Sequence, residues 1–261
     1  MLRFCCCSLV LLGSILPTSA QSSQSDVEKN AWALAGQLVK LHRAWTTIST
    51  KGASIEVKEL LRKEAPGAGA VVQYHFYVKG LPEGHLFDYV NWPINQREPQ
   101  TSLQGISIGK DGILMCAARS PEQCGDLTKK DDPIEFTYIA QKGEPFRIAI
   151  VDSENPDTRL TTVLVPDPIE TRTKGCSWNV IQLLPKFVLA YLQGSGFPSN
   201  TDISFESWSY KENHILSGKT DDSGALQIAM MPNVAGHDSG TTHVRAMAPD
   251  CSPSIEFEWG R

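Results

Sequence analysis

One segment of the chain carries the residue types of a serine hydrolase. The sequence GHDSG places His237, Asp238 and Ser239 side by side. A catalytic triad is assembled from separated segments, so three consecutive residues cannot reproduce its geometry, and the G-x-S-x-G spacing of a nucleophile elbow is absent. A polar turn between two strands accounts better for the motif. We therefore predict no catalytic residue in this segment.

Clustered carboxylates form a second candidate, because they can act as general acids and bases or bind a hard cation. The clusters are Asp131 with Asp132, then Asp152, Glu154, Asn155 and Asp157 in DSENPD, and Asp221 with Asp222. All of them occur in turn-like segments, where Asp and Asn are favoured because they bond their own backbone. DSENPD holds the oxygen donors that Ca²⁺ prefers but lacks the glycine and closing glutamate of an EF-hand. We predict turns, no metal and no cofactor, with calcium at residues 152–157 left open.

Aromatic residues give the best indication of ligand binding. Tyr89 and Trp92 occur in DYVNWP, and Trp208 and Tyr210 occur in SWSY. Residues i and i+2 of a strand share one face, so Trp208 and Tyr210 should point the same way. Such side chains can stack on a sugar or a partner, although aromatics of β-sandwiches more often belong to the core. Both interpretations stay open at these four positions.

Four cysteines follow the first twenty residues: Cys116, Cys124, Cys176 and Cys251. An even number in an exported chain indicates two disulfides, for which three pairings are formally open. We favour Cys116 with Cys124, which closes a short loop, and Cys176 with Cys251, which ties together the ends of the last segment. The second bond is worth roughly 4 kcal/mol in the chain-entropy model. A zinc site is not expected, because no C-x-x-C or paired-histidine spacing follows the first twenty residues.

The N-terminus is typical of a secretory signal peptide covering residues 1–20. Arg3 precedes an apolar run to Leu16, and small residues stand at Thr18 and Ala20. This run is shorter than the ~20 apolar residues of a membrane span, and no later segment approaches that length. Removal of the peptide takes away Arg3 and no acid, so the net charge of −5 becomes −6. We expect a secreted protein, periplasmic or extracellular, without nucleic acid or a transmembrane segment.

Residues 21–52 are expected to form a helical N-terminal segment. From Asp26 to Thr50 the apolar positions recur at steps of three and four: Val27, Ala31, Leu34, Leu38, Leu41, Trp45 and Ile48. Ser25 or Asp26 could cap the helix, and Gly52 lies beyond its end. The pattern predicts a short amphipathic helix that packs on a domain or a partner.

The rest of the chain predicts an all-β fold of two antiparallel β-sandwich domains. From residue 53 the periodicity changes to two; VVQYHFYVKG places Val72, Tyr74, Phe76 and Val78 on one face. Short runs of this kind, bounded by Gly, Pro, Asn or Asp, continue to residue 165 and form the first domain. Residues 166–175 contain two prolines and are expected to be a linker. Residues 176–261 contain seven strand candidates, the count of an immunoglobulin-like sandwich.

The segment GSGFPSN is expected to be a corner of the second sandwich. Gly194 and Gly196 can adopt positive φ, Phe197 can enter the core, and Pro198 stops the strand. A phosphate loop is excluded because Lys-Ser/Thr and a helix do not follow the glycines.

The second half also resembles a known type of module. GSGFPSNTDISF, KTDDSGALQIAMMP, GTTHVRAMAPDC and FEWG are similar to the pattern of bacterial secreted Ig-like modules of the IPT/TIG type. With the preceding region, the resemblance to uncharacterised exported bacterial proteins covers roughly residues 81–260. It implies a fold and a compartment, and no active site.

Together these observations predict a secreted, non-catalytic interaction or structural module of the bacterial envelope or the extracellular space. Its partner would be a protein or a carbohydrate. The alternative is a carbohydrate-binding accessory protein or an exported hydrolase that uses Trp92, Trp208 and nearby carboxylates. An enzyme needs a cleft with convergent titratable groups, whereas a binding module shows exposed strand edges or a flat surface patch.

Overall fold

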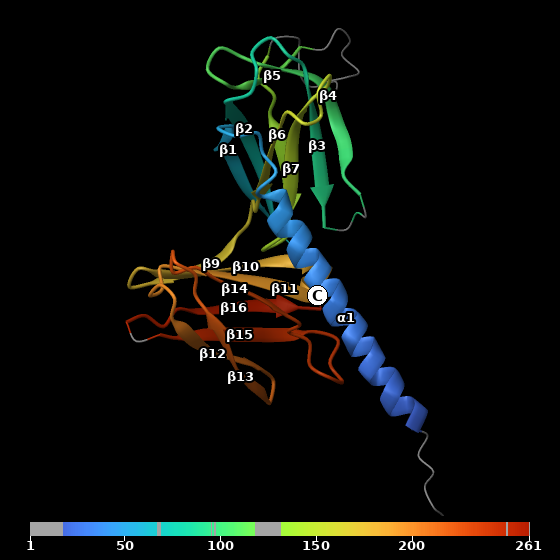
Figure 1. Cartoon of the computed structure of the whole chain (residues 1–261), viewed down its shortest axis with the longest axis vertical. Helices are drawn as coiled ribbons and strands as arrows, with labels where there is room; N and C mark the ends of the chain where they lie inside the picture. The colour runs from blue at the N-terminus through green and yellow to red at the C-terminus, as the bar shows by residue number, and fades with distance from the viewer. Residues whose placement is uncertain are drawn as a thin grey trace, which may run out of the picture. The chain divides into compact units, whose positions relative to one another are not determined.

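The computed structural model describes residues 18–66, 69–94, 96, 98–117, 132–248 and 250–260, with side chains from Lys29 onward (Figure 1). These residues form one helix, α1 (Thr18–Trp45), followed by antiparallel strands. The chain divides into two compact units, with the boundary between Gln37 and Leu38. All strands, together with the end of α1 from Leu38, belong to the second unit. The structure is therefore all-β apart from α1 and a short 3₁₀ turn, as predicted.

The first sandwich combines a three-stranded and a five-stranded sheet. The three-stranded sheet has the order β1–β2–β6, from Ser54–Ala65, Gly69–Lys79 and Phe136–Ala140. The five-stranded sheet has the order β5–β4–β3–β7–β8, from Leu114–Cys116, Gln100–Ile108, Phe87–Pro93, Phe146–Asp152 and Arg159–Leu164. Alternate residues of β2 are buried, among them Val72, Tyr74, Phe76 and Val78, so the period-two pattern placed this face correctly. Phe76 stacks on Phe136 with ring centroids 4.5 Å apart at the centre of the core.

The second sandwich combines two four-stranded sheets. One has the order β14–β11–β10–β9, from Leu226–Met230, Leu189–Ser195, Cys176–Leu184 and Ile169–Thr173. The other has the order β13–β12–β15–β16, from Glu212–Lys219, Asp202–Ser209, Gly240–Met247 and Ser254–Trp259. The 3₁₀ turn η1 (Pro185–Phe187) joins β10 to β11. Trp178, Leu192, Ile203 and Val244 are fully buried in the core between the sheets.

The expected linker at residues 166–175 is largely a strand. Ile169–Thr173 forms β9, which pairs with β10 from Cys176↔Thr173 to Val180↔Ile169. Pro166 and Pro168 precede the paired residues and leave the ladder intact, because proline is tolerated at the start of a strand. The turn at Lys174 and Gly175 uses positive φ at both residues. The second sandwich therefore begins within the segment that sequence reasoning assigned to the connection.

The helix is displaced toward the N-terminus relative to the expected segment. It includes Ser25 and Asp26, which therefore do not cap it, and it ends at Trp45. The hydroxyl groups of Thr46 and Thr47 donate to the carbonyls of Arg43 and Ala44, which satisfies acceptors at the helix end. Ile48 lies beyond this end and is exposed. The apolar residues keep a helical spacing up to Ile48, so the sequence predicted a later helix end. The hydrogen bonds of the two threonines, which stop the helix, cannot be seen in that spacing.

Residues 1–17 of the expected signal peptide lie outside the described residues, and Thr18 and Ala20 fall in α1. The described part of the chain contains no helix that is both long and apolar enough to cross a membrane.

The corner at Gly194–Pro198 has the predicted core anchor. Phe197 is buried, and its ring meets that of Trp178 edge to face, with centroids 5.6 Å apart. Gly196 has φ +77°, as expected, but Gly194 does not have positive φ. A Cβ on Gly194 would lie 2.7 Å from the Phe197 ring and 2.9 Å from the Trp178 ring. Glycine at 194 is therefore required by the packing of two aromatic rings, whereas glycine at 196 is required by the backbone.

Candidate functional site

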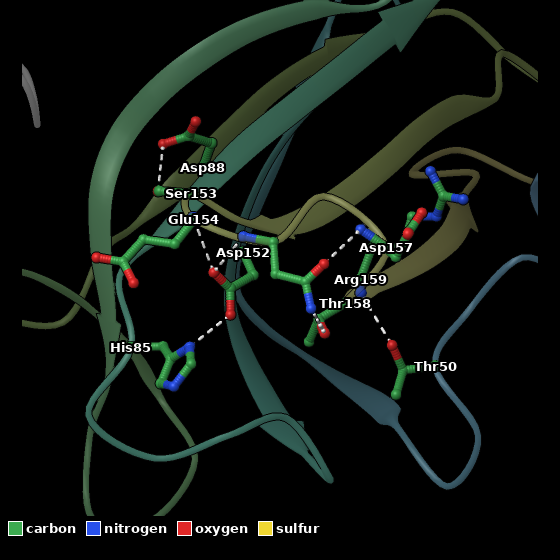
Figure 2. Close-up of polar contacts among 10 residues, drawn as sticks. Thr50, His85, Asp88, Asp152, Ser153, Glu154, Asp157, Thr158 and Arg159 are labelled. Atoms are coloured by element: carbon green, nitrogen blue, oxygen red, sulfur yellow. Dashed lines mark hydrogen bonds and ion pairs between the residues drawn. The ribbon is translucent and has the colours of Figure 1, made fainter.

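The acidic segment DSENPD forms the turn between β7 and β8 (Figure 2). The Asp152 side chain is buried, and its Oδ1 accepts hydrogen bonds from the backbone N–H groups of Glu154 (2.9 Å) and Asn155 (3.1 Å). Its Oδ2 lies 2.6 Å from Nδ1 of His85. Burial alone would raise the pKa of the Asp152 carboxyl, but the bonds from Glu154, His85 and Asn155 hold that pKa below its usual range.

The neighbouring carboxylates do not converge on Asp152. In Figure 2 the carboxylates of Glu154 and Asp157 point away from it. Asp88 instead accepts a hydrogen bond from the Ser153 hydroxyl at 3.0 Å. The described residues include no group of three or more His, Cys, Asp or Glu side chains placed to hold a metal ion. The geometry is that of an Asx-type turn that closes a hairpin.

The other candidate clusters also form turns where they are described. The Asp221 carboxylate accepts hydrogen bonds from the Ser223 hydroxyl (2.6 Å) and the Ala225 N–H (2.9 Å), which lower its pKa. Asp131 lies outside the described residues. In GHDSG, the His237 ring stacks on Tyr210 with centroids 3.7 Å apart, so this histidine supports an aromatic side chain.

The first aromatic pair belongs to the core. Tyr89 is buried and its hydroxyl hydrogen-bonds that of Tyr138; burial raises the pKa of Tyr89. Trp92 lies on the opposite face of its sheet, where the edge of Trp45 meets it with centroids 5.5 Å apart. The Arg147 guanidinium lies 5.4 Å from the centroid of the Trp92 ring. Neither aromatic of this pair presents a free surface to a ligand.

Trp208 lies on the outer face of the sheet that contains β12, and Tyr210 follows in the turn after β12, with its ring centroid 6.3 Å from that of the buried Trp259. Trp208 is half-buried and stacks nearly parallel on His243, with centroids 5.0 Å apart and 8° between the planes. Tyr210 is 53% exposed, stacks on His237, and donates its hydroxyl to the Ser239 carbonyl at 2.5 Å. Tyr210 also has φ +51°, a region that non-glycine residues rarely adopt. Each aromatic ring is thus held by a histidine on one side.

A hydrogen-bonding group adjoins these rings. The Glu206 carboxylate accepts from Nδ2 of Asn213 (2.8 Å) and from Nη2 of Arg245 (3.0 Å). The strand register accounts for this, because Glu206 lies opposite Arg245 on β15 and two residues before Trp208 on β12. A shallow groove of about 410 Å³ is lined by Glu206, Trp208, Tyr210, Lys211, Glu212, Asn213 and Arg245. We call this groove and its aromatic pair the Trp208 face.

Sequence reasoning found the aromatic pair of the Trp208 face and missed its polar neighbours. Glu206 precedes Trp208 by two residues on β12, which is a local signal for their shared face. Asn213, His243 and Arg245 are brought beside β12 by the strand register, and His237 reaches Tyr210 from the loop before β15.

The predicted bond between Cys176 and Cys251 is present, with Cα atoms 6.1 Å apart. Cys116 is disulfide-bonded. Cys124, its expected partner, lies outside the described residues.

The arrangement of the Trp208 face can bind, since it offers flat apolar rings beside charged hydrogen-bonding groups. It brings no nucleophile next to a general base among the described residues. The function has to be argued from this geometry, because no protein-family model matches the chain and no curated protein matches it at a significant level.

Proposed function

We propose that the chain is an exported, non-catalytic binding module of the bacterial envelope or extracellular space, with an Ig-like second sandwich, and that its Trp208 face binds polysaccharide. The observation that carries the proposal is the aromatic pair on this face. Trp208 and Tyr210 are both solvent-accessible, and each is held in place by a stacked histidine. Fixed aromatic rings bind with little loss of side-chain freedom, which favours association.

The chemistry of the face matches that of a sugar chain. Pyranose rings present C–H groups on their faces and hydroxyl groups around their edges, so they bind where an aromatic ring adjoins planar polar groups. Trp208 and Tyr210 supply the rings, and Glu206, Asn213 and Arg245 supply donors and acceptors. The groove is open, which suits a polymer that passes over the face better than an enclosed small molecule.

A protein partner is a second candidate, because β13 is an edge strand with an exposed apolar pair. Ile215 is 72% exposed and Leu216 is 41% exposed, and β13 stands at the end of its sheet order. An extended peptide could add to such an edge through backbone hydrogen bonds. Ile215 lies opposite Glu206 and so borders the groove, whereas Leu216 lies opposite the buried Phe205 and belongs to the other face of the sheet. A change at Leu216 therefore separates the two candidates.

The test is retention of the purified chain on insoluble chitin, cellulose and peptidoglycan. We expect retention by at least one of these, and a loss of about tenfold or more in affinity for Trp208→Ala and Tyr210→Ala. Trp32→Ala removes another exposed tryptophan, 47% accessible on α1, and should bind normally. Leu216→Lys should also bind normally, because Leu216 lies on the other face of the edge strand.

Equal retention of Trp208→Ala and wild type would rule out this face, and failure of all three polymers to retain the chain would remove the polysaccharide proposal. A loss of binding in Leu216→Lys alone would favour the strand edge and a protein partner. Turnover of any polymer that stops in Glu206→Gln would show that the module is a hydrolase.

A further inference from the structure

A second concave site lies where the end of α1 meets the segment from β8 to β9 and the sheet of the second sandwich. The cavity has a volume of about 430 Å³. His42 and Thr46 line it from the end of α1, Thr161 and Thr162 from β8, and Asn179 and Gln193 from β10 and β11. All of these residues belong to the compact unit that begins at Leu38. The volume falls within the range of about 300–1,000 Å³ that is typical of small-molecule pockets.

One side of the cavity is a row of polar side chains that follows from the strand register. Asn179 pairs with Glu170 on β9 and with Gln193 on β11, so the three side chains share a face. Trp178 and Val180 point into the core, which directs Asn179 outward. Gln227 continues the row on β14, but its Oε1 accepts from Arg43 and from the Tyr191 hydroxyl. The part of the row that lines the cavity is Glu170, Asn179 and Gln193.

Two side chains of the cavity wall carry buried polar atoms without a hydrogen-bond partner. His42 is only 3% exposed, and its Nδ1 has no partner among the described residues. The Oδ1 of Asn179 is likewise buried and unpaired there. Buried polar atoms are almost always paired, because an unpaired one loses its hydration without compensation. Both of these side chains line the cavity, so a small rotation that turns either atom toward it would let a polar ligand supply the missing hydrogen bond.

The charge of the wall disfavours an anionic ligand. Burial, and then the positive charge of Arg147, lowers the pKa of His42 to about 4, so its ring is uncharged at neutral pH. Thr46, Thr161 and Thr162 contribute hydroxyl groups, and Asn179 and Gln193 contribute amides. Glu170 is the charged residue of the lining, and it accepts hydrogen bonds from hydroxyl groups. Side chains of Val163, Val165, Pro168, Ile169 and Ile181 add apolar contacts.

We propose that this cavity binds a small, neutral, polyhydroxylated molecule of about monosaccharide size, with hydroxyl groups bonded by Glu170, Asn179, Gln193 and His42. Vicinal hydroxyl groups suit a row of amide and carboxylate side chains, because each such side chain can bond two neighbouring hydroxyls. This proposal does not depend on the Trp208 face, since the two sites share no lining residue.

The experiment is isothermal titration of the full chain with D-glucose, glycerol and sodium acetate at pH 7. We expect binding of glucose, weaker binding of glycerol, and none of acetate. Asn179→Leu, which keeps the side-chain size and removes both polar atoms, should weaken glucose binding about tenfold or more. Asn213→Leu makes the same change in the Trp208 face and should leave the glucose affinity of the cavity unchanged.

Thr162→Val serves as a second variant that alters the cavity with little effect on folding, and it should weaken glucose binding by a smaller factor. Far-ultraviolet circular dichroism and thermal unfolding confirm that each variant is folded. Glucose binding that is unchanged in both Asn179→Leu and Thr162→Val overturns the proposal. So does binding that is lost in Asn213→Leu alone, binding of acetate in preference to glucose, or the absence of binding by all three probes.

Discussion

The two sandwiches contain similar aromatic pairs that differ in burial. In the first, Tyr89 and Trp92 are buried on the two faces of their sheet, whereas in the second Trp208 lies on an accessible outer face and Tyr210 is exposed in the turn after β12. The difference does not come from residue type, because both pairs combine one tryptophan and one tyrosine close in sequence. Tyr89 is buried in the core between the sheets. For the two tryptophans, the difference comes from what packs on the outer face, which is decided by residues far away in the chain.

The end of α1 is what covers the outer face of the first sandwich. The Trp45 indole N–H lies 3.1 Å from the carbonyl oxygens of both Ile148 and Thr162, which face each other on β7 and β8. This contact brings Trp45 against Trp92 and Ala149 in a small apolar cluster. On the second sandwich, the corresponding aromatic side chains rest on histidines of their own domain and stay accessible. The covered face thus contributes stability, whereas Trp208 stays accessible, as the binding proposal requires.

The largest expected effect on stability comes from removing the disulfide of the second sandwich. Cys176 and Cys251 are separated by 75 residues, and closing a loop of this length stabilises the folded state by about 4 kcal/mol in the chain-entropy model. We expect the variant with both Cys176→Ala and Cys251→Ala to unfold at correspondingly lower urea concentration, measured by tryptophan fluorescence.

If the double variant unfolds in two steps, the stabilities of the two sandwiches can be measured separately. Weakening confined to the second sandwich would leave the Trp45–Trp92 cluster folded while the Trp208 face is lost. A free energy of unfolding unchanged by the double substitution would contradict the prediction. Reduction of the wild type with dithiothreitol is a less specific control, because it also cleaves the disulfide of Cys116.

The next effect is a difference in how much stability is lost when each of two tryptophans is replaced by alanine. Trp92→Ala removes a buried ring that packs on Trp45 and Arg147, so we expect it to lower the free energy of unfolding by about 3 kcal/mol. Trp208→Ala removes a half-buried ring from a surface and should cost about 1 kcal/mol or less. Chemical denaturation of the two variants in parallel measures both values. Similar losses of stability would show that Trp208 is a structural residue, and would weaken the binding proposal.

Much of the fold could be predicted from the sequence, because strand alternation is a local property. The buried face of β2 and the seven strands expected after residue 175 are present. The strand β9 was missed, because Pro166 and Pro168 suggested a break, and its partner β10 lies beyond the turn at Lys174 and Gly175. The helix end was placed too late, because Thr46 and Thr47 look like neutral positions until their hydroxyl groups are seen to bond the helix carbonyls.

The candidate sites could be predicted only in part, because they depend on contacts between distant segments. Trp208 and Tyr210 were expected to share a strand face. They line one groove, but Tyr210 lies beyond the end of β12 with φ +51°, so strand alternation does not place its ring. The cavity beside His42 was not anticipated, because it joins residues from α1, β8 and β10. His42 looked like one of six scattered histidines, and nothing local marks it as buried. Burial of an isolated polar residue is a tertiary property, so no sequence periodicity reveals it.

The smallest of the three effects is a pH dependence that tests how the end of α1 packs against β7 and β11. His42 is buried at the end of α1, with its ring against Tyr191 at a centroid distance of 5.4 Å and with Arg147 nearby. Its pKa is about 4 in the folded chain, lowered by burial and by Arg147, against an ordinary value of 6.5. The unfolded chain therefore binds a proton at His42 between these pH values while the folded chain does not. Stability from this residue is complete above about pH 6.5 and falls as the pH drops toward 4.

We expect this single group to account for a loss of roughly 2 kcal/mol between pH 7 and pH 4. His42→Phe keeps an aromatic ring and removes the titration, so its stability should fall less than that of the wild type over the same range. His214→Gln, a change at an exposed histidine of β13, should follow the wild-type curve. Urea unfolding at several pH values measures the difference between the curves. If His42→Phe and wild type lose the same stability on acidification, His42 is not held neutral at the end of α1.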